Sequence, residues 1–278
     1  MIALLLALAL AQAPLPQADE IMLRVAANQD RAEALRAKWI YHQQLHVRST
    51  GSDHKLHREE ASEFNVVPGP GGTTRNVVVI SGRYLHKGKY VEYRQTTAAK
   101  LEGEDAEEIE EVRKQLTGDE GARDGLSRKL FPLTAPEIVR YNFTLRGVED
   151  FRGTPVYRLD FEPRPTPGHI DLDTSEGPWA GTVLISRDDF EPVLVTTRNY
   201  HRVPVAMKIL MGVDVKGLGY SVQYQKVADG VWFPVSYGTE YSVRVLFGWS
   251  RTITASLTNS EFRKATVDSK ALFDAVPN

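Results

Sequence analysis

Histidine is the residue type in this chain that could most readily carry metal or acid–base chemistry. Four of the seven histidines, His42, His46, His54 and His57, lie close together, and His42 and His46 share one face of an alternating segment. A zinc site needs three converging ligands, and Glu59 could supply a carboxylate among them. The helical His-Glu-x-x-His motif is missing from the sequence. We therefore expect no metal site and interpret these histidines as polar residues on the solvent face of a sheet.

Motifs for nucleophilic catalysis and phosphate binding are also missing. The sequence has no Gly-x-Ser-x-Gly elbow, and no Ser-x-x-Lys motif begins a predicted helix. Residues 71–74 (Gly-Gly-Thr-Thr) lack the Gly-Lys-Ser/Thr that completes a phosphate loop. The carboxylates Asp188 and Asp189 fall in a predicted hairpin turn, where Asp bonds the local backbone. We expect no catalytic residue and no cofactor, and a metal-dependent hydrolase using the early histidines is the least favoured hypothesis.

Composition and the N-terminus indicate an exported protein. A formal net charge of -2 gives no basic surface for nucleic acid. The absence of cysteine excludes disulfides, a thiol nucleophile and a lipid-modified N-terminal Cys. Residues 1–13 combine a short apolar run with small residues at Ala9, Ala11 and Ala13, which is typical of a signal peptide. No segment reaches the ~20 apolar residues of a transmembrane helix. We expect a periplasmic protein whose residues 14–278 form a single domain.

Two segments have the periodicity of amphipathic helices. Residues 19–36 predict a helix with an apolar stripe that includes Ile21, Val25 and Leu35. Residues 104–116 predict a charged helix whose stripe is thin, with Ile109 and Val112 on it. This second helix lies in an insertion at about residues 100–134, which also contains a predicted short helix around Leu126. The insertion is either a solvated surface excursion or a lid over an opening.

The rest of the chain alternates between apolar and polar residues, which predicts strands. The longest such segment is 231–247, and we expect its bend or bulge at Gly238. Residues 68–72 are dense in Pro and Gly and predict a loop, residues 147–153 predict a turn, and Asp229-Gly230 predicts a hairpin. Strands are expected to resume at Pro136. About ten or eleven sequential strands predict a mainly β fold, a curved antiparallel half-barrel with an N-terminal helix and a helical lid insertion.

The predicted apolar faces exceed what one simple core requires. The late strands, the stripe at Ile21 and the thin stripe at Ile109 all need apolar partners. A small closed barrel fills itself with side chains, whereas an open or larger one leaves a cavity for a ligand. We therefore expect an apolar ligand cavity beneath the covering elements.

Several motifs are similar to those of a known superfamily. The helix opens with Ala18-Asp19-Glu20-Ile21, and residues 181–193 combine a strand, an acidic turn and Pro192-Val193. Together with residues 141–147, 153–157 and 161–163, they resemble the outer-membrane lipoprotein-sorting superfamily of LolA/LolB-like periplasmic carriers and related sensors. The resemblance covers nearly the whole mature chain. It implies an antiparallel half-barrel closed by helices, with a hydrophobic cavity for acyl chains.

The expected function is that of a periplasmic, non-enzymatic carrier or binding protein for a lipid, an acyl chain or a lipoprotein. The alternative is an envelope sensor or interaction module that binds a peptide or partner protein on its concave face. The expected cavity wall contains Phe143, Leu159, Phe161, Val235, Tyr237, Tyr241 and Val243, and the lid residues Ile109, Val112 and Leu126 are expected to close it.

Overall fold

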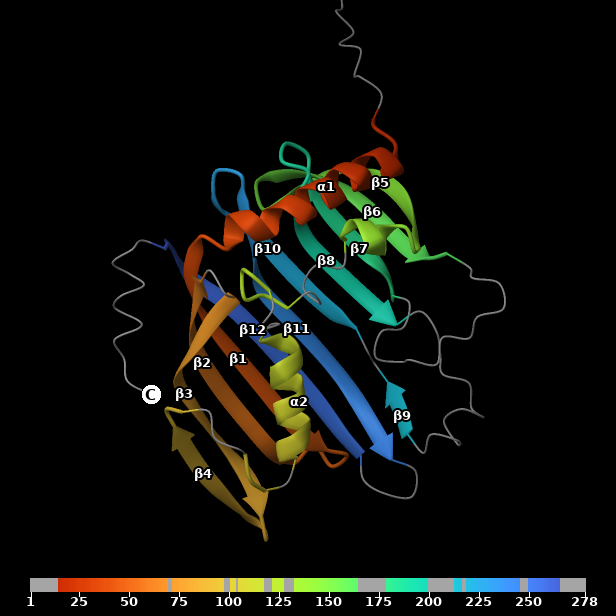
Figure 1. Cartoon of the computed structure of the whole chain (residues 1–278). Coiled ribbons are helices and arrows are strands. Elements are labelled where there is room, and N and C mark those ends of the chain that lie inside the picture. The colour runs from red at the N-terminus through yellow and green to blue at the C-terminus, as the bar shows by residue number, and fades with distance from the viewer. Residues whose placement is uncertain are drawn as a thin grey trace, which may run out of the picture.

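A computed structural model of the chain describes residues 15–69, 72–97, 101–103, 105–117, 122–127, 133–164, 179–199, 213–216, 219–245 and 250–265. The expected signal peptide at residues 1–13 lies outside this part of the chain and stays a prediction. Within the described residues, one antiparallel sheet is covered on one face by helices (Figure 1). We call the helix-covered side of the sheet its inner face.

In the described part of the chain, the sheet is open and contains twelve strands. Their bounds are β1 Trp39–Gly51, β2 Leu56–Gly69, β3 Gly72–His86, β4 Lys89–Gln95, β5 Tyr141–Phe151, β6 Thr154–Pro163, β7 Trp179–Ser186, β8 Pro192–Asn199, β9 Val213–Lys216, β10 Tyr220–Ala228, β11 Val231–Val245 and β12 Ser250–Lys264. The strand order is β4-β3-β2-β1-β12-β11-β10-β8-β7-β6-β5, with β9 paired to β11 beside this path. The expected mainly β, antiparallel half-barrel is confirmed.

The pairing of β1 with β12 joins two meanders into one sheet. Leu45 of β1 lies opposite Leu257 of β12, and the register continues from there toward both ends of the pair. In β12, Ile253, Ala255 and Leu257 are buried and the residues between them are exposed. Because side chains alternate between the faces of a strand, this pairing makes one continuous apolar inner face.

Two hairpins have turns that suit the twist of antiparallel strands. Lys87 and Gly88 have φ angles of 48° and 79°, and Arg152 and Gly153 have φ angles of 55° and 84°. Two-residue loops with positive φ at both positions are the common connection between twisted strands. The turn predicted at residues 147–153 is therefore too long, because β5 ends only at Phe151. β5 continues through Gly147, where the register with β6 shifts in a bulge.

Three further local predictions are wrong. The bulge of β11 lies at Val235 instead of Gly238, because Ser236 and Pro234 face consecutive residues of β10. Proline has no N–H to donate to the ladder, which explains the irregularity there.

The loop predicted at residues 68–72 is too long. β2 continues through Gly69, which pairs with Gly72 of β3. Pro136 begins no strand and lies in the short helix α3 (Ala135–Ile138).

The N-terminal helix α1 (Ala18–Arg36) matches the predicted segment and lies across the inner face (Figure 1). Ile21 and Val25 are fully buried, as the apolar stripe predicts. Leu35 departs from the prediction because its residue is 37% exposed, and Arg36 is buried in its place. The helix therefore presents a charged group to the interior at its C-terminal end, and this charge needs a partner.

Asp124 of the insertion supplies that partner. Arg36 Nε lies 2.7 Å from Asp124 Oδ2, and both side chains are almost completely buried. The hydroxyl of Tyr41 donates to the backbone oxygen of Asp124 at 3.0 Å, and Arg75 donates to the backbone oxygen of Gly125 at 2.9 Å. These contacts attach the segment 122–127 to α1, β1 and β3.

Glu191 fixes the middle of α1 to the start of β8. The side-chain amide of Gln29 donates to Glu191 Oε2, and the amide of Asn28 donates to the backbone oxygens of Asp189 and Phe190 at 2.8 and 3.0 Å. Burial raises the pKa of Glu191 to about 7, against the opposing effect of Arg36. Glu191 is thus protonated more readily in the folded protein than in the unfolded chain.

This raised pKa predicts that stability falls as the pH rises. Between pH 4.5, the ordinary pKa of Glu191, and about 7, the folded state retains a proton that the unfolded chain releases. The contribution is complete below pH 4.5 and is lost as the pH passes 7, a difference of roughly 3 kcal/mol. Glu191→Gln is expected to remove this slope, measured as the difference in urea-unfolding free energy between variant and native protein from pH 5 to 8. Asp188→Asn, in the same turn but exposed, is the control and should leave the slope in place. An unchanged slope in Glu191→Gln would contradict the assignment.

Candidate ligand-binding site

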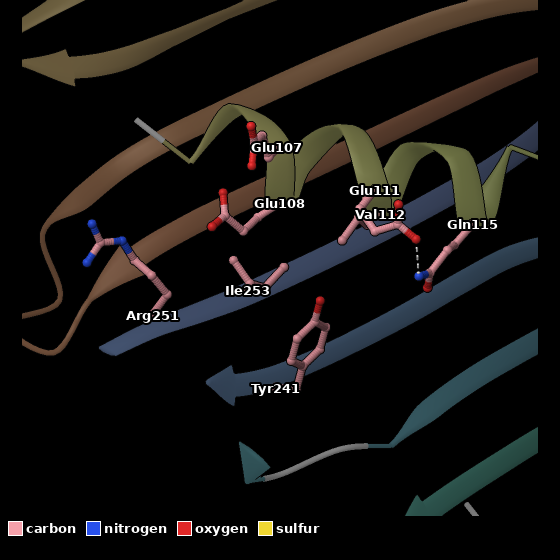
Figure 2. A pocket seen from close by; sticks show the side chains of 8 residues that line it. All are labelled: Glu107, Glu108, Glu111, Val112, Gln115, Tyr241, Arg251 and Ile253. Atoms are coloured by element: carbon pink, nitrogen blue, oxygen red, sulfur yellow. Dashed lines mark hydrogen bonds between the residues drawn. The ribbon is translucent and has the colours of Figure 1, made fainter. Parts of the chain in front are cut away.

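A cavity of about 310 Å³ lies between the insertion helix α2 (Ala106–Leu116) and the strands β11 and β12. Figure 2 shows it from close by, with the helix above and the two strands below. The residues that line it are Glu107, Glu108, Glu111, Val112, Gln115, Tyr241, Arg251 and Ile253. The cavity therefore lies under the segment that the sequence predicts as a lid.

Local periodicity and strand pairing position the apolar part of this wall. Val112 belongs to the buried stripe of α2, which also contains Ile109 and Leu116 at helical spacing. Tyr241 and Ile253 are directly opposite each other on β11 and β12, so both side chains leave the sheet on the same face. The wall thus combines one valine from the helix with a tyrosine and an isoleucine from the sheet.

The polar part of the wall comes mainly from α2. Glu107, Glu108 and Glu111 of α2 line the cavity, and Figure 2 shows Glu108 on the side of the helix nearer to the strands. Gln115 donates its amide to Glu111 at 2.6 Å. Burial raises the pKa of Tyr241, and the carboxylates of Glu108 and Glu111 raise it further. The Tyr241 hydroxyl therefore stays neutral at physiological pH.

A buried ion pair holds the N-terminal end of α2. Arg251 Nε donates to both oxygens of Asp105, at 2.8 and 3.1 Å, and the hydroxyl of Ser49 donates to the same carboxylate. The side chains of Arg251 and Asp105 are only 13% and 7% exposed. Asp105 also takes a left-handed backbone conformation with φ of 56°, which Asp and Asn tolerate better than most residues. We call this contact between Asp105, Arg251 and Ser49 the N-terminal latch.

A second polar contact holds the following turns of α2. Arg113 lies 3.5 Å from the buried carboxylate of Glu60 on β2. Glu60 also accepts hydrogen bonds from Ser62 at 2.7 Å and from the Tyr93 hydroxyl at 2.8 Å. Burial and the nearby Glu60 carboxylate raise the pKa of Tyr93, so its hydroxyl remains a donor. The helix is therefore attached to β12 at its N-terminal end and to β2 nearer its C-terminal end.

Two of the ten residues that the sequence predicts as ligand-binding, Val112 and Tyr241, line the cavity. Ile109 and Leu126 are buried in the core instead of lining it. Val235 occupies the bulge of β11, and Tyr237 stacks on Tyr220 with ring centroids 5.7 Å apart.

The remaining predicted residues lie elsewhere or cannot be placed. Phe143, Leu159 and Phe161 are on β5 and β6, strands at one end of the sheet order, and Phe143 and Phe161 are in contact with ring centroids 6.1 Å apart. Val243 pairs with Arg251 across β11 and β12, and its side chain lies outside the described part of the structure. Ligand contacts at all ten positions stay predictions.

The sequence-based prediction missed the residues that give this cavity its charge. Glu107, Glu108 and Glu111 have helical spacing, but the sequence alone does not show which side of a charged helix faces a cavity. Ile253 had a detectable signal, because it alternates with Thr252 and Thr254 in a strand pattern.

The early histidines do not assemble a metal site in the part of the chain that the structure describes. There, no group of three or more His, Cys, Asp or Glu side chains could hold a metal ion. His42 lies 3.4 Å from Asn65 and 3.6 Å from Glu63, both on β2.

None of the described helices is both long and apolar enough to cross a bilayer.

No protein-family model and no curated protein matches the sequence. Similar solved structures include an outer-membrane lipoprotein-sorting protein domain from Vibrio parahaemolyticus, 13% identical over 90% of this chain and 94% of that chain, with a TM-score of 0.39. A LolA superfamily protein from Nitrosomonas europaea is 12% identical over 92% and 97%, with a TM-score of 0.33. Lipoprotein LppX from Mycobacterium tuberculosis is 9% identical over 89% and 97%, with a TM-score of 0.30.

All three structures are no more than 13% identical to this chain and have TM-scores below 0.5.

If the N-terminal latch holds α2 on the sheet, weakening it should make the helix open more often. Asp105→Asn retains the backbone preference and an acceptor for Ser49 but removes the carboxylate charge that pairs with the Arg251 guanidinium. We expect a loss of about 3 kcal/mol in the stability of this contact, because removing the charge of one partner from a buried ion pair is strongly destabilising. Faster hydrogen exchange of the α2 amides is the measurement.

Glu110→Gln is the matched control on the same helix. It breaks only the more exposed pair with Lys114, whose atoms lie 3.3 Å apart, and is expected to change stability by less than about 1 kcal/mol. Equal amide protection in Asp105→Asn and Glu110→Gln would show that the latch does not hold the helix.

Proposed function

We propose that this protein is a non-enzymatic binding protein or carrier of the bacterial cell envelope, and that it holds an acyl chain of a lipid or lipoprotein in the cavity between α2 and the strands β11 and β12. The observation that carries the proposal is the apolar base of this cavity. Val112, Tyr241 and Ile253 meet there from opposite sides, beneath a helix that polar contacts attach to the sheet.

The chemistry of the base favours an apolar chain over a polar ligand. Val112 and Ile253 offer only hydrocarbon, and the Tyr241 side chain offers one hydroxyl beside its ring. A polar ligand placed against these groups would lose hydrogen bonds to water without replacement. An alkyl chain gains about 0.8 kcal/mol for each methylene group that it removes from water.

The size of the cavity favours a single slender ligand. Its volume of about 310 Å³ is at the lower end of the range of small-molecule sites, roughly 300–1,000 Å³. A cargo with two or three acyl chains requires more room, which outward movement of α2 would provide. The contacts at Asp105 and Glu60 are the ones that this movement would break.

The sequence motifs support the same class of cargo. The chain resembles LolA/LolB-like carriers, and that resemblance implies acyl chains as ligands in a cavity closed by helices. The apolar run at residues 1–13 supports export to the compartment where such carriers act.

A series of linear alcohols tests the binding of an apolar chain. Affinity is expected to rise about fourfold for each added methylene group, from about 0.8 kcal/mol of burial, and to level off when the cavity is full. Isothermal titration with octanol, decanol and dodecanol measures this slope. Organic extraction of the purified protein, followed by mass spectrometry, tests for a lipid that is bound on isolation.

Variants on both walls place the ligand. Ile253→Phe and Val112→Phe enlarge side chains from the sheet and from the helix, and each is expected to weaken dodecanol binding about tenfold, the equivalent of roughly two displaced methylene groups. The control is Val148→Phe, at an exposed position on β5. Folded wall variants that bind dodecanol as the native protein does would refute this location. A protein that binds no alcohol, carries no lipid and retains a stoichiometric envelope protein would favour the interaction module instead.

A further inference from the structure

We infer that the cavity favours an amphiphile with a cationic amine head group over one with a carboxylate or phosphate head group. This inference rests on the proposed binding of an apolar chain in the same cavity. The apolar base provides the place for the chain, and the charge around the base then determines which head group can accompany it.

The charges that line the cavity are unbalanced. The residues that line it include three carboxylates, those of Glu107, Glu108 and Glu111, and one guanidinium, that of Arg251. The Arg251 charge is already matched by Asp105, whose two oxygens lie 2.8 and 3.1 Å from Arg251 Nε. The guanidinium therefore does not compensate the three glutamates, and the cavity carries a negative potential.

The pairing of acidic residues on α2 differs between the cavity side and the rest of the helix. Glu110 does not line the cavity and lies 3.3 Å from Lys114. Among the described residues, no Lys, Arg or His lies within ion-pairing distance of Glu107, Glu108 or Glu111. Uncompensated carboxylates in a cavity attract a cation and repel an anion, and this effect is strongest at low ionic strength.

Stabilisation of the helix dipole explains only part of this pattern. Glu107 and Glu108 are in the first turn of α2, where acidic residues favour helix formation. Glu111 lies beyond the first turn and gains little from the dipole, yet it lines the same cavity. It accepts a hydrogen bond from Gln115 one turn further on, which supports the helix but leaves the charge of Glu111 unneutralised.

Tyr241 adds a neutral hydrogen-bonding group to the same space. Figure 2 shows its hydroxyl directed toward α2, and no described residue forms a hydrogen bond with it. Because this hydroxyl stays neutral, it can accept a hydrogen bond from an ammonium group. A carboxylate head group could instead accept a hydrogen bond from the same hydroxyl. The three glutamate carboxylates, which attract an ammonium group and repel a carboxylate, therefore determine the preference.

Three amphiphiles with the same tail test the inference. Dodecylammonium, dodecanol and dodecanoate are titrated at pH 7, below the concentrations at which they form micelles, at low and at high salt. We expect dodecylammonium to bind about tenfold more tightly than dodecanoate at low salt, with dodecanol between them. High salt is expected to reduce this ratio to about twofold, because ions screen the exposed carboxylates.

Charge-neutralising variants locate the effect. Glu107→Gln combined with Glu108→Gln and Glu111→Gln is expected to bring the ratio of dodecylammonium to dodecanoate affinity close to one. Glu110→Gln is the matched control and should retain the native ratio. If the triple variant does not fold, as judged by circular dichroism, the single variant Glu111→Gln is expected to lower the ratio about twofold.

The outcomes separate this inference from the proposed function. If none of the three amphiphiles binds, the proposed apolar-chain site is wrong. If all three bind equally well to the native protein, the site stands and the head-group preference is overturned. A preference that persists in the folded triple variant also overturns the inference, because its cause would lie outside these carboxylates.

Discussion

The apolar inner face of an open sheet has to be covered, and the rest of this structure depends on how that is done. Pairing of β1 with β12 makes the inner face continuous across the two meanders, so its apolar area is larger than either meander would present alone. Each Å² left in water costs about 25 cal/mol. The helix α1 and the insertion with α2 provide the cover, and the proposed site is a space that remains beneath α2.

Buried charges determine where this cover is attached. Arg36 binds Asp124, Arg251 binds Asp105, and Arg113 lies close to Glu60, so each pair joins elements that are distant in the sequence. Such pairs add little net stability because both partners lose hydration, but an unpaired partner is costly. They therefore favour one placement of the covering segments over others. With α2 attached in this way, its glutamates and Val112 stay beside the cavity.

The local structure of the chain follows from its sequence pattern. Alternation along the strands, the stripe through Ile21 and Val25, and the stripe through Ile109 and Val112 all predict elements that the structure contains. The hairpin predicted at Asp229-Gly230 is also present, between β10 and β11. These features depend on residues that are neighbours in the chain, and a short window of sequence contains the information.

The sequence by itself therefore determined a mainly β chain with an amphipathic first helix, a helical insertion and apolar surface in need of a partner. Only the tertiary structure decided that β1 pairs with β12, that Tyr241 meets Ile253 beside Val112, and that Arg251 is matched by Asp105 and not by the three glutamates that line the cavity. The reason is physical. Alternation specifies which face of a strand is apolar, but it does not specify the neighbouring strand or the charge that lies above it.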